Sequence, residues 1–148
     1  LVVPIKMTNF TLEVGKTDNR HGDSVQRKAL VKTLSNGDFT YRGPIFQGVK
    51  DSLGPSATLV VGGVEVVVSS ERRQCLDREM LRVAGIELSN HRLLVIKSAV
   101  HFRADFDSVA AHIFDADTPG TNRPDFNAYE FKRLRRPIYP LDQDVNWS

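Results

Sequence analysis

Apolar and polar residues in the N-terminal part of the chain follow the patterns of strands. They alternate over residues 10–14, which predicts a half-buried strand. Strand-like runs at 25–35 and 38–42 flank Asn36-Gly37, and this dipeptide between two such runs predicts a β-hairpin. Residues 44–56 contain repeated Gly and Pro and are therefore predicted to form a loop.

A second hairpin is predicted where residues 57–61 and 64–70 flank Gly62-Gly63. Valine recurs almost without interruption in the second of these runs. A strand that is apolar on both sides is usually covered on both faces. We therefore expect this hairpin to form a central pair of the sheet.

A short helix is predicted over residues 78–84. Asp77 stands at the N-cap position, where its side chain can accept hydrogen bonds from the first free backbone N–H groups. Gly85 follows the helix and is suited to end it. Leu76 and Leu81 have the spacing of a hydrophobic staple. These signals predict local structure and carry no information about function.

The stretch around residues 93–103 combines an apolar run with a helix signal. Four consecutive apolar residues, Leu93–Ile96, predict a buried strand, and Ser98 is a favourable N-cap for a following helix. The residues expected to line the apolar face of that helix are Phe102, Phe106, Val109, Ala110 and Ile113.

Three basic side chains, Lys97, His101 and Arg103, would gather where this strand ends and the helix begins. Free backbone N–H groups at a helix N-terminus favour a bound anion. The alternative is an ordinary strand-to-helix turn with solvated charges.

The C-terminal part of the chain contains few periodic patterns. Residues 112–116 are predicted to form another strand and residues 118–125 a loop. Pro137 and Pro140 stand too close together for a long helix. Because strands outnumber helices, the predicted fold class is α+β: a mostly antiparallel or mixed β-sheet with hairpins and two or more short helices.

Composition limits the classes of function. A chain of 148 residues is long enough for one domain, which we expect to span residues 1–148. A net charge of +2 does not indicate nucleic-acid binding, and no apolar run reaches the length of a membrane span. Cys75 is the sole cysteine, which excludes an internal disulfide and favours a cytoplasmic protein. The chain begins at Leu1 rather than Met, so we expect a fragment of a longer polypeptide.

A metal site built from neighbouring residues is not indicated. The four histidines form no His-x-x-x-His pair, and Cys75 has no partner for a Cys-x-x-Cys motif. A site assembled from distant segments, with Asp18, His21 and His101 as ligands, remains an alternative. It would make the chain an independent metalloenzyme.

Five short motifs occur in order along the chain: Val14–Gly22, Phe39–Pro44, Val61–Val67, Lys97–Ala104 and Arg135–Asp142. Together they resemble the C-terminal domain of the microcystinase C family of bacterial metallopeptidases. The resemblance extends from about Phe10 to Asp142. Each motif alone is weak, but five in the same order are specific.

The resemblance implies that this chain is the C-terminal domain of a two-domain zinc metallopeptidase acting on linear peptides, such as opened microcystin. The catalytic zinc is then expected in an N-terminal domain outside this sequence, which would be the partner of this one. The chain itself is expected to contain no catalytic residue, metal ligand or cofactor and to be inactive alone. Neither nucleic acid nor membrane is expected as a partner.

Within this reading, two polar stretches are expected to line the substrate cleft and to lie side by side at one edge of the sheet. They are the loop 16–22 and the turn 97–103. Their cations would hold substrate carboxylates, which arginine can do with two hydrogen bonds. The substrate-binding residues predicted in this way are Lys16, Asp18, Arg20, His21, Lys97, His101 and Arg103.

A non-catalytic oligomerisation or domain-docking module is the alternative function. In that case the edges of the valine hairpin and the tail 134–141 would form the contact, with another domain or with a second copy in a homo-oligomer.

Overall fold

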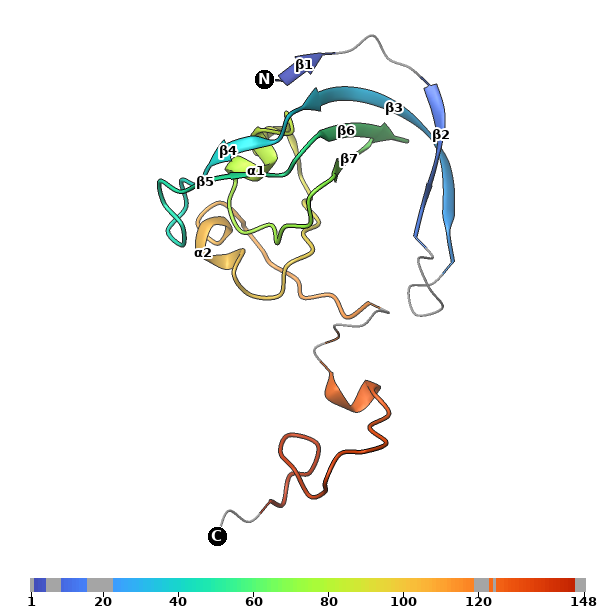
Figure 1. The fold of residues 1–148 in the computed structure, drawn as a ribbon, viewed down its shortest axis with the longest axis vertical. Coiled ribbons are helices and arrows are strands. Elements are labelled where there is room, and N and C mark those ends of the chain that lie inside the picture. The colour runs from blue at the N-terminus through green and yellow to red at the C-terminus, as the bar shows by residue number, and fades with distance from the viewer. Residues whose placement is uncertain (1, 5–8, 16–22, 119–122, 124, 146–148) are drawn as a thin grey trace. The chain divides into compact units, whose positions relative to one another are not determined.

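The computed structural model describes residues 2–4, 9–15, 23–118, 123 and 125–145. Contacts divide the chain into two units, residues 1–13 with 25–113 and residues 14–24 with 114–148, which are taken separately below. The strands are β1 (Val2–Pro4), β2 (Asn9–Val14), β3 (Val25–Ser35), β4 (Asp38–Thr40), β5 (Lys50–Ser52), β6 (Ser56–Val61) and β7 (Val64–Ser69) (Figure 1). The helices are α1 (Glu79–Arg82) and α2 (Arg103–Phe106), and the 3-10 turns are η1 (Leu88–Asn90) and η2 (Phe126–Ala128).

A five-stranded sheet forms most of the first unit. Its strands follow the order β1-β3-β6-β7, and β2 also pairs with β3. β3 pairs antiparallel with β1 and β6, and β6 pairs antiparallel with β7. β4 and β5 form a second, antiparallel two-stranded sheet. The predicted strand at 10–14 and the α+β fold class are confirmed.

The hairpin predicted at Gly62-Gly63 is confirmed, with Val61 opposite Val64. Its expected place as a central pair is wrong for β7, which ends the strand order, whereas β6 lies between β3 and β7. Val64 is accordingly 62% exposed. The valine repeat correctly predicted a strand, but it did not indicate whether that strand pairs with one neighbouring strand or with two.

The hairpin predicted at Asn36-Gly37 is wrong, because β4 pairs with β5 rather than with β3. Gly37 lies where the chain leaves one sheet for the other. Its N–H donates to Ser35 Oγ (3.0 Å), and its carbonyl accepts from Leu53 N (3.0 Å). A Cβ at Gly37 would lie 2.2 Å from the carbonyl oxygen of Gly54. The segment predicted as a loop, 44–56, therefore contains β5 and packs against this turn.

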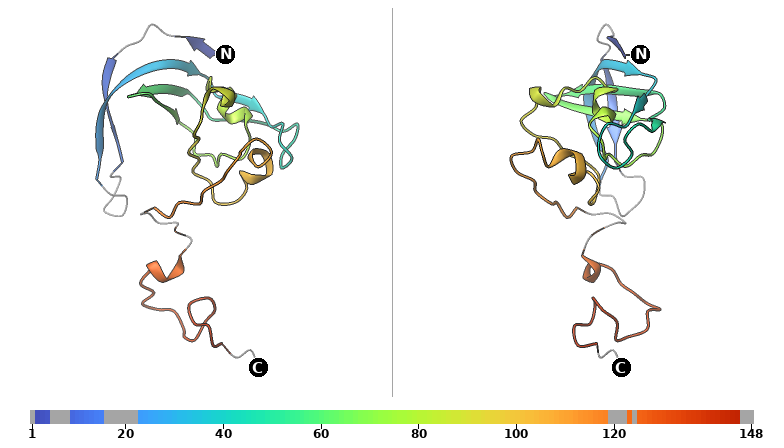
Figure 2. Two further views of the ribbon diagram at one scale, coloured as in Figure 1. Left: turned by 180° about the vertical axis from the view of Figure 1, so that it is seen from behind. Right: turned by 90° about the vertical axis from the view of Figure 1, so that its left-hand side faces the viewer.

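Helix α1 is confirmed, although its regular part is shorter than the predicted 78–84. Asp77 Oδ1 accepts from Glu79 N (2.8 Å), as expected of a cap. Gly85 has a φ of +81° and ends the helix, and Ile86 N donates back to Leu81 O (3.0 Å). α1 lies beside β4 in both views of Figure 2.

Two clusters of buried side chains form the core of the first unit. The cluster between α1 and the small sheet contains Phe39, Tyr41, Leu53, Leu76 and Met80. The other contains Leu81, Ile86 and Phe106, against which Val67, Cys75, Leu88, Ile96 and Phe102 pack. Thr58, which is fully buried on β6, donates to the carbonyl of Ala84 (2.5 Å) and so ties the end of α1 to the sheet.

The strand predicted at Leu93–Ile96 is wrong, and the helix predicted after Ser98 is confirmed only for the four residues of α2. Residues 93–98 have no regular secondary structure, and α2 spans four residues. The hydroxyl of Ser98 accepts from the side chain of Gln74 (2.9 Å) instead of capping a helix. Val109 is 52% exposed, so the expected apolar face is buried mainly near Phe106. The strand predicted at 112–116 is absent as well.

The second unit contains little regular structure in its described residues. Asp125 caps η2 by accepting from Asn127 N (2.9 Å). No long helix forms around Pro137 and Pro140, as predicted. Across the described residues, no helix is long and apolar enough to cross a membrane.

Candidate functional site

The segment Lys97–Arg103 contains the three described members of the predicted substrate-binding set. Lys97 and His101 are exposed and Arg103 is half-buried. The other four predicted residues, Lys16, Asp18, Arg20 and His21, lie outside the described residues. Their expected meeting with His101 therefore stays a prediction.

Gln74 holds the imidazole of His101 in place. Its amide nitrogen donates to Ser98 Oγ (2.9 Å), and its amide oxygen lies 3.2 Å from His101 Nδ1. An amide oxygen can only accept, so Nδ1 must carry a hydrogen in this arrangement. The neutral imidazole then has its lone pair on Nε2, which could accept a proton or a hydrogen bond from a ligand. Sequence analysis missed Gln74, which lies outside all five motifs.

Arg103 contacts two residues of its own segment. Its guanidinium lies 4.0 Å from Asp107 Oδ1, one helical turn further on, and stacks over the Phe102 ring at 5.2 Å from the ring centroid. An ion pair as long and as accessible as this contributes little to stability. These contacts place the Arg103 guanidinium beside Phe102 and Asp107.

Two buried carboxylates fix the position of α2 and hence of this segment. Asp77 is 1% exposed and accepts from the backbone N–H groups of Arg42 (2.9 Å) and Gly43 (2.6 Å). Asp105, on α2, is 6% exposed and accepts from the backbone N–H (2.7 Å) and Nε (3.0 Å) of Arg78. Hydrogen bonds to charged acceptors of this kind are strong. The carboxylates thereby connect α2, the start of α1 and the motif at 39–44.

Gly43 is required where these carboxylates approach each other. A Cβ at this position would lie 2.9 Å from Asp77 Oδ2 and 3.0 Å from Asp105 Cγ. Burial and both carboxylates raise the pKa of the nearby Cys75 thiol to about 11. Cys75 is therefore protonated at neutral pH and is a poor nucleophile. Because Gly43 is needed at this contact, the motif at 39–44 has a structural role in the described part of the chain.

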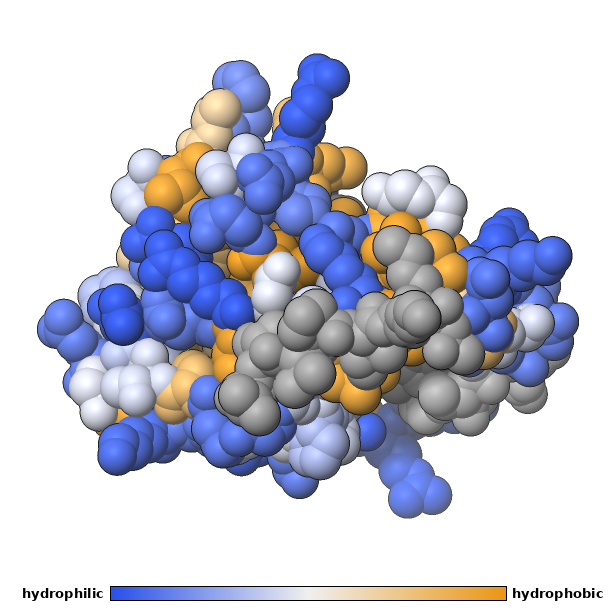
Figure 3. Space-filling view, turned by 90° about the horizontal axis from the view of Figure 1, so that it is seen from above, coloured by the Kyte–Doolittle hydropathy of each residue, from blue (hydrophilic) through white to orange (hydrophobic). Residues whose placement is uncertain are grey.

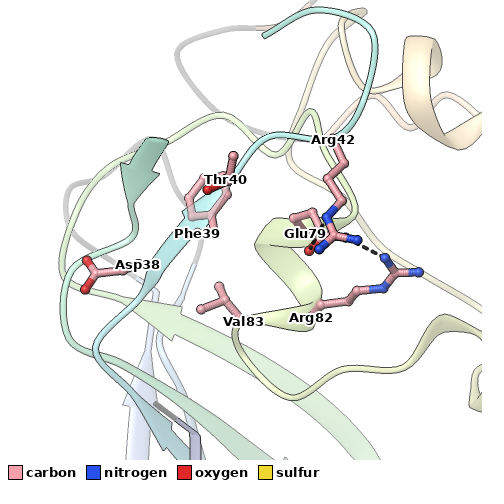
Figure 4. Close-up of a pocket in the computed structure, with 7 residues that line it drawn as sticks. All are labelled: Asp38, Phe39, Thr40, Arg42, Glu79, Arg82 and Val83. Atoms are coloured by element: carbon pink, nitrogen blue, oxygen red, sulfur yellow. Dashed lines mark hydrogen bonds and ion pairs between the residues drawn. The ribbon is translucent and has the colours of Figure 1, made fainter. Parts of the chain in front are cut away.

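A shallow hollow of about 330 Å³ lies between β4 and α1. Arg42 and Arg82 reach toward Glu79 from its two sides (Figure 4), with Arg42 Nε 3.7 Å and Arg82 Nη1 2.5 Å from its carboxylate. Asp38 also lines the hollow, so two acids balance two arginines. Because the arginines already share a carboxylate, this hollow shows no preference for an anion.

The last motif closes a loop in the second unit. Arg136 Nε donates to Asp142 Oδ2 (2.6 Å), which also accepts from Ile138 N (2.6 Å). These hydrogen bonds lower the pKa of Asp142 to about 2. The motif therefore shapes the tail, and Tyr139 within it is 62% exposed.

No group of three His, Cys, Asp or Glu side chains that could hold a metal ion occurs among the described residues. His101 belongs to that part of the chain, whereas Asp18 and His21, the other two ligands of the independent metal site considered above, lie outside it.

Comparison with known proteins gives the family. The model of the family described as "MlrC C-terminus" matches residues 8–133. Microcystinase C of Sphingomonas sp. is 24% identical over 96 residues, which cover 65% of this chain and 18% of that protein.

The crystal structure of a "putative metallopeptidase" from Mesorhizobium sp. BNC1 is similar to this structure with a TM-score of 0.79 and 27% sequence identity. The match covers 95% of this chain and 28% of that one, so the chain spans less than a third of either relative. The family match, which extends over most of the sequence, shows that the chain belongs to the MlrC C-terminus family.

Proposed function

We propose that this chain is the C-terminal domain of a zinc metallopeptidase of the microcystinase C type that cleaves linear peptides. The observation that carries the proposal is the family match over residues 8–133. The relatives are much longer than this chain. The remaining part of the parent protein is proposed to bind the zinc and carry out the hydrolysis.

The role proposed for this domain is to form one side of the substrate cleft. Lys97, His101 and Arg103 occur within seven residues and are accessible at least in part. A linear peptide with an unmodified C-terminus has a terminal carboxylate, for which lysine and arginine are suitable partners. His101, with Nδ1 facing Gln74, would present Nε2 to the substrate. Lys16, Asp18, Arg20 and His21 are proposed to complete the cleft.

A role limited to docking is the second candidate. Apolar side chains of the tail 134–141 favour it, because Leu134 is 38% and Tyr139 62% exposed. Exposed apolar residues in a continuous segment often mark a contact with another domain or with a second copy. In this case the basic residues would have no direct effect on the reaction.

Alanine variants of the full-length parent protein distinguish the two roles. For His101→Ala and Arg103→Ala we expect kcat/KM on a linear peptide to fall roughly 10- to 100-fold, since a hydrogen bond to a charged group is worth 1.5–3 kcal/mol. Thermal midpoints should stay close to the wild type. Arg27→Ala and Lys28→Ala, exposed basic residues on β3, serve as matched controls and should leave kcat/KM unchanged. Wild-type kinetics in both test variants would reject the cleft role and leave docking.

A further inference from the structure

The segment Leu93–Ile96 has the side chains of a buried strand but lies on the surface. Leu93 is 77% and Val95 87% exposed, whereas Leu94 is 37% exposed and Ile96 packs on the core. Exposure thus alternates from one residue to the next, as it does along a strand that lies with one side on its own domain. The outward side is apolar and uncovered by the described residues.

The backbone of this segment is uncovered in the same way. Within the described part of the chain, no backbone hydrogen bond joins residues 93–98 to another segment, and no sheet includes them. A run of unpaired N–H and C=O groups with apolar side chains is the usual template for pairing with another strand. Figure 3 shows apolar side chains among hydrophilic ones on one face of the molecule.

We propose that Leu93–Ile96, here called the docking strand, adds to the edge of a β-sheet in the remaining part of the parent protein. The inference rests on the proposed function, which makes this chain one domain of a longer protein. The two relatives extend far beyond the matched region, so a covering element from the same polypeptide is available in proteins of this family. Strand addition satisfies the free backbone groups and buries Leu93 and Val95 together.

Charge defines the chemistry of the partner edge. Between Ser89 and Ala104 the chain contains Arg92, Lys97 and Arg103 and no acidic residue. A partner edge that is apolar in the middle and carries Asp or Glu at its ends would complement the docking strand. Because Lys97 and His101 follow the docking strand directly, this pairing would bring the proposed substrate-binding residues to the boundary with the catalytic part.

Thiol labelling of the full-length parent protein tests the proposal. Val95→Cys is compared with Val49→Cys, a control in which the original valine is 51% exposed and lies outside the docking strand and the valine hairpin. Each maleimide labelling rate, read by peptide mass spectrometry, is divided by the rate of the same variant in denaturant. We expect the cysteine at position 95 to react roughly 100-fold more slowly than the control, because labelling then requires transient opening. The raised thiol pKa of Cys75 keeps its own background reaction low.

Hydrogen exchange of the unmodified parent protein is the second measurement. The amides of residues 93–97 should be protected to the same extent as those of β6, without any substitution to disturb the contact. Equal labelling at positions 95 and 49, or unprotected amides, would overturn the docking strand. Protection that disappears on dilution would also overturn it, because the partner would then be a second copy. A parent protein that protects the segment but hydrolyses no peptide would refute the proposed function and leave the docking strand standing.

Discussion

Replacement of Asp77 by alanine tests the buried carboxylate that joins three segments of the domain. Asp77 is 1% exposed and accepts backbone hydrogen bonds from Arg42 (2.9 Å), Gly43 (2.6 Å) and Glu79 (2.8 Å). Alanine would leave these three N–H groups without their acceptor. A buried donor without a partner costs about 1–3 kcal/mol, and water can reach some of these groups after the change. We therefore expect a loss of roughly 3–5 kcal/mol, a large part of the stability of a typical domain.

Urea unfolding followed by circular dichroism measures this loss. Asp77→Asn should be intermediate, at about 2 kcal/mol, because one amide oxygen cannot accept all three hydrogen bonds. Asp107→Ala is the control, since the Asp107 side chain is 57% exposed and should change the free energy of unfolding by less than about 0.5 kcal/mol. A value for Asp77→Ala within about 1 kcal/mol of the wild type would refute the role assigned to this carboxylate.

Two further substitutions test backbone and pH effects. Gly37 (φ +82°) and Gly62 (φ +54°) both have a backbone conformation that disfavours alanine, but only Gly37 also lacks space for a Cβ. Gly37→Ala should therefore lower the free energy of unfolding by more than about 3 kcal/mol, and Gly62→Ala by about 1–2 kcal/mol. Equal shifts in thermal midpoint for the two variants would contradict this difference. The Tyr41 hydroxyl donates to Asp51 (2.8 Å), and burial with this hydrogen bond raises the pKa of Tyr41 from 10.0 to about 12. A raised folded-state pKa stabilises the protein below pH 10 and loses that contribution as the pH approaches 12. Tyr41→Phe should therefore be less stable than the wild type by about 1 kcal/mol at neutral pH. This stability difference should fall between pH 10 and about 12, and a difference that stays constant with pH would argue against the role of the Tyr41 hydroxyl.

Local signals predicted the parts of the fold that depend on a few neighbouring residues. The Asp77 cap and the Gly85 stop defined α1, because both act through the free backbone groups at helix ends. Gly62-Gly63 defined the hairpin of β6 and β7 for a similar reason, as two glycines can adopt the positive φ of a tight turn.

The errors arose where long-range pairing decides the structure. Asn36-Gly37 has the local chemistry of a hairpin, yet β3 finds its partners in β1, β2 and β6. The run Leu93–Ile96 has the composition of a buried strand, but Leu93 and Val95 are exposed, and no sheet partner is present among the described residues. The periodicity of a sequence indicates which side of a strand or helix is apolar, but it does not indicate which segment packs against that side.

The candidate site was predictable only in part. Lys97, His101 and Arg103 were selected because they crowd one short segment, and the structure describes all three there. The contact between Gln74 and His101 joins residues 27 positions apart and has no signal in the sequence. The carboxylates Asp77 and Asp105 also escaped selection as a pair, since single acids in a sequence usually indicate solvated surface.

The role proposed for this chain is to assist a peptidase without itself being one. The most direct measurement is hydrolysis of a linear peptide, followed by mass spectrometry, by the zinc-loaded parent protein and by the 148-residue chain supplied with zinc. We expect cleavage by the parent protein and none by the isolated chain. Cleavage by the isolated chain, or a parent protein that is folded and zinc-loaded yet cleaves no linear peptide, would contradict this expectation.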